Sequence, residues 1–124
     1  MEPKRYREPV EVTFTFPPSA AQDVGYVSVT VRELTPSMEA RALARSNNDG
    51  AVMMQEMVKE CLVRGVRLDG SILTASIADN SADQLLSELG PKGRTLLLAA
   101  YNKVNQPPKE DLDGFLQSAS ASVG

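Results

Sequence analysis

Apolar and polar side chains alternate in two stretches near the start of the sequence. Residues 10–16 carry apolar side chains at every second position, namely Val10, Val12, Phe14 and Phe16. Residues 26–32 repeat this pattern with Val27, Val29 and Val31, alternating with Ser28, Thr30 and Arg32. A period of two is typical of a strand with one solvated face. Because only Pro17-Pro18 and a small polar loop separate the stretches, we predict an antiparallel β-hairpin.

From residue 35 the apolar spacing lengthens to three and four, which indicates amphipathic helices. Thr35 suits a helix N-cap and Pro36 the first helical position, so we predict a helix over residues 36–47. The polar residues 46–50 end this helix. A second helix is predicted to end at Gly65, and its apolar side chains are Met53, Met54, Met57, Val58, Cys61 and Leu62.

Two helices are predicted between residues 81 and 105. Ser81 and Gln84 have the form of a capping box, and Gly90-Pro91 ends the short helix that they begin. A longer helix follows from about residue 91 to residue 105, and Pro107-Pro108 stops it. Its buried stripe is predicted to consist of Leu96, Leu97, Ala100, Tyr101 and Val104.

Two segments are less regular. Residues 66–80, around Asp69-Gly70, fit either a small hairpin or an irregular loop. A last short helix is predicted beyond the two prolines, although Gly114 weakens it by about 1 kcal/mol relative to alanine. One face of that helix would carry Leu112, Phe115, Leu116 and Ala119.

The order of these elements predicts an α+β fold, with an N-terminal antiparallel β-hairpin followed by four or five mostly amphipathic helices. We predict one domain over residues 10–107, a flexible N-terminus over residues 1–9, and a short helix with a disordered tail over residues 108–124. Hydrophobic residues make up 42% and charged residues 23% of the chain, which agrees with a folded domain.

Charge and composition narrow the class of protein. Thirteen basic and sixteen acidic residues give a net charge of −3, whereas a protein that binds nucleic acid usually has a basic excess. The apolar run near Leu96 is far shorter than the roughly 20 residues that span a bilayer. The single cysteine, Cys61, lies among apolar residues and suits a reducing compartment. We therefore expect a cytoplasmic protein without a nucleic acid or membrane partner.

The sequence offers little material for catalysis. It contains no histidine, which removes the commonest general base and most zinc sites. Glu56 and Glu60 are one helical turn apart, but Lys59 beside them favours a solvated charged face. A calcium-loop pattern ends at Glu56 but begins with Arg45, a cation where the first ligand should be a carboxylate. We expect no enzyme activity, no cofactor and no metal.

Two groups of apolar side chains are candidates for binding another protein. Met53, Met54 and Met57 could form an adaptable groove, although plain core packing is the favoured explanation. Leu112, Phe115 and Leu116 would be exposed on the last helix of a free chain. We therefore predict that residues 109–120 form a binding segment that docks by burying apolar surface.

Four segments within residues 25–107 form a combination that is shared with a known family. They are Val31-Arg32-Glu33-Leu34-Thr35, Val63-Arg64-Gly65-Val66 with Leu68-Asp69-Gly70, Ala82-Asp83-Gln84-Leu85-Leu86, and residues 97–105. Together they resemble the small tail assembly chaperones of long-tailed bacteriophages. This resemblance implies a cytoplasmic, mainly helical protein with a short β element. Such a protein binds the tape-measure protein, recruits tail-tube subunits and leaves before the tail is finished, without cofactor or chemistry.

Other functions stay open at the level of sequence. A baseplate-hub assembly chaperone has a similar size and helical content. A permanent virion or scaffold subunit could use the N-terminal strands to extend a neighbour's sheet. An RNA-binding module could use Lys92 and Arg94 in the loop Gly90-Pro91-Lys92-Gly93, although the acidic net charge argues against it. The sequence does not decide whether the chain also associates with itself.

Overall fold

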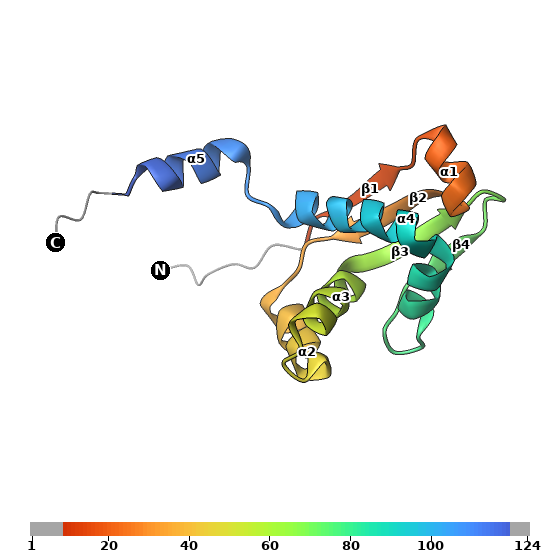
Figure 1. The fold of residues 1–124 in the computed structure, drawn as a ribbon, viewed down its shortest axis with the longest axis horizontal. Helices are drawn as coiled ribbons and strands as arrows, with labels where there is room; N and C mark the ends of the chain where they lie inside the picture. Colours follow the sequence, from red (N-terminus) through yellow and green to blue (C-terminus); the bar gives the residue numbers. More distant parts are fainter. Residues whose placement is uncertain (1–8, 120–124) are drawn as a thin grey trace, which may run out of the picture.

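The computed structural model describes residues 9–119 as a four-stranded antiparallel sheet with helices (Figure 1). The strands are β1 (Glu11–Thr15), β2 (Tyr26–Arg32), β3 (Leu62–Arg67) and β4 (Ile72–Thr74), in the spatial order β1-β2-β3-β4. The helices are α1 (Pro18–Val24), α2 (Pro36–Ser46), α3 (Gly50–Cys61), α4 (Ser81–Asn105) and α5 (Lys109–Gln117). The predicted α+β class is confirmed. The predictions for residues 1–8 and 120–124 lie outside the described range.

The N-terminal hairpin forms as predicted, and its connection is itself helical. β1 pairs with β2 so that Val12 faces Val31 and Phe14 faces Val29. In place of the predicted polar loop there is the helix α1, which begins at Pro18, ends at Val24 and is capped by Gly25 with φ +84°. Only a residue that tolerates a left-handed conformation can reverse the chain there without strain.

One face assignment in β2 is wrong. The alternation predicted Val27 on the buried face, but Val27 is 39% exposed while Tyr26 is buried. The cause is a register shift between Tyr26 and Ser28 where β2 pairs with β3. Such an irregularity changes which side chain faces the core.

Helices α2 and α3 form a hairpin whose ends carry the expected caps. The hydroxyl of Thr35 accepts a hydrogen bond from the backbone N–H of Met38, and Pro36 occupies the first turn. The connection contains two residues with positive φ, Asn47 and Asn48. The carboxylate of Asp49 then accepts from the first N–H groups of α3.

The predicted end of the second helix is wrong. α3 stops at Cys61, and residues 62–67 form β3, an inner strand paired with β2 and β4. The sheet therefore has four strands instead of the predicted two. Of the two predictions for residues 66–80, the hairpin is correct, because β3 and β4 pair in antiparallel orientation and the chain turns between them at Asp69 and Gly70. Gly70 has φ +89°, a conformation that glycine adopts without strain.

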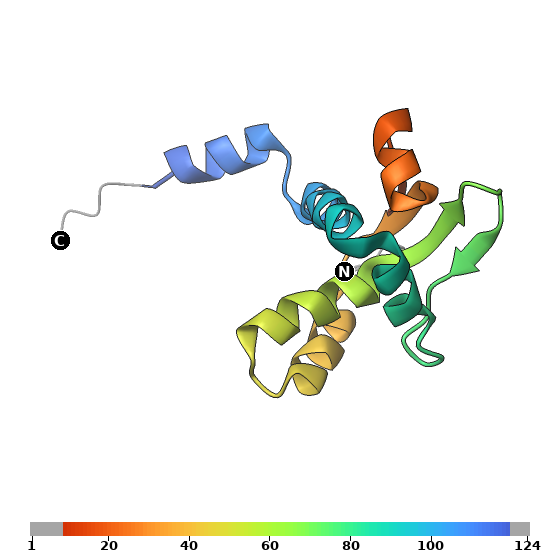
Figure 2. The ribbon, with the colours of Figure 1, turned by 45° about the vertical axis from the view of Figure 1, so that its right-hand side comes forward.

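Helix α4 crosses the sheet and supplies much of the core (Figure 2). It bends at Gly90, which has a non-helical φ of +70°, as Gly90-Pro91 predicted. The capping box is wrong: Ser81 is already helical, and the side chain of Gln84 donates to Glu88. In the second half Leu97, Ala100 and Tyr101 are buried and Val104 is partly buried, whereas Leu96 is 37% exposed.

Candidate functional site

The last helix, α5, stands apart from the folded body. Figures 1 and 2 show it projecting from the end of α4. None of its residues is buried. Glu110 and Asp111 lie in its first turn, where carboxylates interact favourably with the helix dipole. Lys109 forms an ion pair with Asp113 one turn later, at 2.6 Å between Nζ and Oδ2. The helix is therefore supported by its own local contacts.

The three apolar side chains predicted on this helix lie together and face solvent. Leu112 is 39%, Phe115 is 74% and Leu116 is 60% exposed. Their spacing of three and four residues places them on one side of the helix. An exposed phenylalanine with two neighbouring leucines is a feature of protein contact surfaces. We call the helix with this apolar side the α5 arm.

The root of the arm is fixed to the body. The side-chain oxygen of Asn105 accepts a hydrogen bond of 2.7 Å from the backbone N–H of Leu34. The amide nitrogen of Asn105 donates to the carbonyl oxygen of Tyr101. A shallow hollow of about 570 Å³ lies beside this contact and is lined by residues such as Pro9, Leu34, Val104 and Pro107. The direction in which the arm leaves is thus set by the end of α4.

The three candidate methionines do not share one surface. Met57 packs against the core, and its sulfur lies 3.9 Å from the hydroxyl of Tyr101. Met53 is half-buried. Met54 is exposed and lines a hollow of about 220 Å³ between α3 and α4. A role of these methionines in binding stays a prediction.

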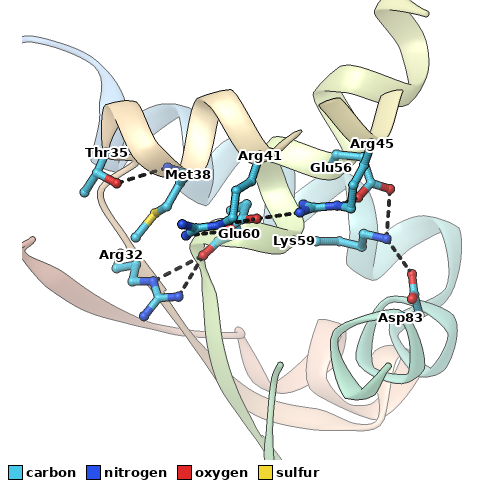
Figure 3. A network of polar contacts seen from close by, with 9 residues as sticks. All are labelled: Arg32, Thr35, Met38, Arg41, Arg45, Glu56, Lys59, Glu60 and Asp83. Carbon is cyan, nitrogen blue, oxygen red and sulfur yellow. Dashed lines mark hydrogen bonds and ion pairs between the residues drawn. The ribbon is translucent and has the colours of Figure 1, made fainter. Parts of the chain in front are cut away.

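A partly buried network of charged side chains joins α2, α3 and α4 (Figure 3). Glu56, Lys59 and Glu60 are all buried, so the predicted solvated face is wrong. The ion pairs of the network are Arg45 with Glu56 (2.5 Å), Arg45 with Glu60 (2.8 Å), Arg41 with Glu60 (3.1 Å), Lys59 with Glu56 (2.8 Å) and Lys59 with Asp83 (2.9 Å).

The network holds its carboxylates ionised. Burial opposes the ionisation of Glu60, but hydrogen bonds from Arg41 and Arg45 outweigh burial and lower its pKa. Burial likewise opposes the ionisation of Glu56, and hydrogen bonds from Lys59 and Arg45 lower its pKa. Arg32 of β2 donates to the backbone carbonyl of Glu60, near the end of α3. These contacts fasten the α2–α3 hairpin to the sheet, so we assign the network a structural role.

The other side chains that the sequence suggested for metal binding, RNA binding or reactivity make structural contacts instead. Glu56, the last residue of the calcium-loop pattern, is ion-paired within the network. Lys92 pairs with Asp23, and Arg94 donates to the carbonyl of Leu86 across the bend in α4. Burial raises the pKa of Cys61 to about 12, which makes its thiol unreactive.

The described part of the chain contains neither a metal-binding cluster nor a membrane span. No group of three or more acidic or cysteine side chains within residues 9–119 could hold a metal ion. No helix in that range is long and apolar enough to cross a membrane.

Sequence reasoning missed a second polar cluster, around Glu88. Its carboxylate accepts hydrogen bonds from Arg67 at 3.0 Å, Tyr26 at 2.5 Å and Gln84 at 2.9 Å. These bonds lower the pKa of Glu88 to about 2, and the bond from Arg67 has the largest effect. Burial and the contact with Glu88 raise the pKa of Tyr26 to about 12. The cluster ties α4 to β2 and β3, and only the spacing of Gln84 and Glu88 is visible in the sequence.

We expect Glu88→Gln to lower the melting temperature by about 2–4 °C at neutral pH, because it removes the negative charge that pairs with Arg67. The effect is modest because the carboxylate is partly solvated. A depressed pKa stabilises the fold above the ordinary carboxyl value and ceases to do so as pH falls towards the folded value. The difference from the unchanged protein should therefore disappear between pH 4.5 and about 2. Melting curves across this range, with the exposed Ser87→Ala as control, test this, and a pH-independent difference would contradict it.

Comparison of the chain with protein-family models, curated proteins and solved structures found no match.

Proposed function

We propose that this chain is a non-enzymatic assembly chaperone that binds another protein through the α5 arm. The observation that carries the proposal is the exposure of Leu112, Phe115 and Leu116 on a helix that contributes nothing to the core. Apolar surface gains about 25 cal/mol per Å² when it leaves water. A helix with anchors three and four residues apart is suited to a hydrophobic groove or to another helix.

The size of the arm favours a temporary complex. α5 has nine residues and three large apolar side chains, so the surface that it can bury is small. Part of the gain from burial is offset by the loss of translational and rotational freedom on association. An arm of this kind binds and releases, as an assembly chaperone must.

The resemblance to tail assembly chaperones supports a more specific form of the proposal. In that form the partner is the tape-measure protein, a tail-tube subunit or both, and the chain acts during tail assembly in the host cytoplasm. The acidic net charge and the absence of histidine agree with a protein that acts by binding. No cofactor is required.

The proposal is tested by affinity purification of the tagged full chain from cells that express its neighbouring genes, followed by mass spectrometry. Recovery of a tape-measure protein or a tube subunit, with the chain missing from finished particles, is the expected result. Finding the chain in finished particles would support a permanent subunit instead. Recovery of no tail protein would contradict the tail-assembly form.

Phe115→Ala is expected to reduce recovery of the partner about tenfold, because the largest exposed apolar side chain of the arm is lost. The body should fold normally, since α5 has no buried residue. Gln117→Ala is the matched control, because helical periodicity places Gln117 away from the apolar side. Equal recovery with both variants would show that the arm is not the binding surface.

A further inference from the structure

A mostly apolar groove runs between the edge strand β1 and the second half of α4. Its volume is about 240 Å³, and its lining includes Phe14, Phe16, Val29, Leu96, Ala99 and Ala100. Ala99 and Ala100 carry only methyl groups, so this wall leaves room for a large side chain. The chain therefore has both an exposed apolar helix and an open apolar groove.

The second half of α4 and the arm carry opposite net charges. Residues 91–105 of α4 contain Lys92, Arg94 and Lys103 and no acidic residue. The arm contains three acidic residues, Glu110, Asp111 and Asp113, and one lysine. Lys103 makes no ion pair with any residue between 9 and 119, and neither does Asp111. The two surfaces can therefore attract each other electrostatically.

The spacing of these charges matches that of the apolar groups. Lys103 lies one helical turn beyond Ala99 and Ala100, and Asp111 lies one turn before Phe115. If the arm lay antiparallel to α4 with Phe115 over the alanines, Asp111 would lie beside Lys103. A single orientation thus satisfies both the apolar and the charged groups.

The connection to α4 directs the arm away from its own groove. Gln106 has ψ 138° and Pro108 has ψ 147°, so the connection is extended. Pro107-Pro108 favours the stiff polyproline II conformation, which resists the reversal needed to lay α5 back on α4. Figures 1 and 2 show the arm pointing away from the body. The arm that fits this groove is therefore the arm of another copy.

We propose that the α5 arm docks into the groove between β1 and α4 of a second copy of this chain, with Phe115 over Ala99 and Ala100 and Asp111 beside Lys103. If each copy gives its arm to the other, the contact is symmetric and closes as a dimer. A foreign partner of the arm must then displace it, so self-association and partner binding compete. The dimer is measured without a partner, which separates this inference from the proposed function.

The first test is the mass of the full chain in solution, measured by light scattering over a wide concentration range. The expected result is a reversible dimer whose dissociation constant rises at least about tenfold in Phe115→Ala and stays unchanged in Gln117→Ala. Circular dichroism verifies that each variant is folded. A chain that stays monomeric at all concentrations, or a Phe115→Ala variant that dimerises normally, would overturn the proposal.

The second test exchanges the charges. Lys103→Glu and Asp111→Lys should each raise the dissociation constant about two- to fivefold, as expected for an exposed ion pair. The chain with both changes should recover the original value, because each arm again meets an opposite charge. A double variant weaker than either single variant would count against the assigned orientation.

The third test distinguishes a second copy from self-docking. One chain carries Ala99→Cys and a mass tag, and an untagged chain carries Leu116→Cys, which leaves Phe115 in place. Mild oxidation should give a disulfide between chains of different mass. The unaltered protein is the background control, since Cys61 is buried. No mixed disulfide, together with a disulfide inside a chain that carries both changes, would show that the arm folds onto its own groove.

Discussion

Gly65→Val is expected to destabilise the folded chain by about 3 kcal/mol or more, through overpacking of the core. A Cβ at position 65 would lie 2.7 Å from Cε2 of Tyr26 and 2.9 Å from Cδ1 of Leu85. Neither neighbour can move easily, because both are buried and the Tyr26 hydroxyl is bonded to Glu88. Position 65 is in the inner strand β3, so a shift of the backbone would disturb its pairing with β2 and β4.

Urea unfolding followed by circular dichroism measures this effect. Gly50→Ala is the matched control, because a Cβ at position 50 would meet no atom within 4 Å. It should change the free energy of unfolding by no more than about 0.5 kcal/mol. A Gly65→Val chain with the unfolding midpoint of the unaltered protein would show that Tyr26 and Leu85 do not enclose this position.

Elements whose signals are local in sequence were predicted well. The period-two patterns gave both strands of the N-terminal hairpin, and Thr35-Pro36 gave the start of α2. Pro107-Pro108 gave the break between α4 and α5. In each case the determining residues are immediate neighbours, and their effect on the backbone does not depend on the rest of the fold.

Elements that depend on distant residues were predicted poorly. The apolar spacing of α3 continues at Leu62, so we predicted that the helix runs on to Gly65. The segment 62–67 becomes a strand because β2 and β4 supply hydrogen-bond partners on both sides. The exposure of Val27 has a similar origin, in the irregular pairing of β2 with β3. Such pairings override local preference and are invisible in a short window of sequence.

In the candidate site, too, local features could be predicted from the sequence and features that depend on distant residues could not. The apolar side of α5 follows from its own spacing, but that it stays uncovered depends on where α4 ends. The charged network was missed because Glu56 and Glu60 on one helix resemble a solvated face. A usable signal was present: Arg41 and Arg45 have the same four-residue spacing on the preceding helix of a tight hairpin. Two facing rows of opposite charge indicate an ionic contact between the helices.

The second large loss of stability is expected from a substitution at Glu60, within the charged network. Glu60→Gln is expected to destabilise the fold by about 2–3 kcal/mol at neutral pH, because it leaves Arg41 and Arg45 without the carboxylate between them. Breaking a fully buried pair costs about 3–5 kcal/mol, and the solvent exposure of Arg41 reduces that cost. Glutamine preserves the shape of the side chain, so the change measures the lost charge.

The pH dependence of this effect has a defined direction. The pKa of Glu60 is lowered from 4.5, since hydrogen bonds from Arg41 and Arg45 outweigh the opposing effect of burial. Its contribution is therefore complete above the ordinary carboxyl pKa and decreases as pH falls below it. Urea unfolding from about pH 7 to about pH 3 should show the two proteins converging in acid. The exposed Glu110→Gln controls for loss of one negative charge, and a difference that is equally large at both ends of the range would show that lost packing, rather than lost charge, destabilises the variant.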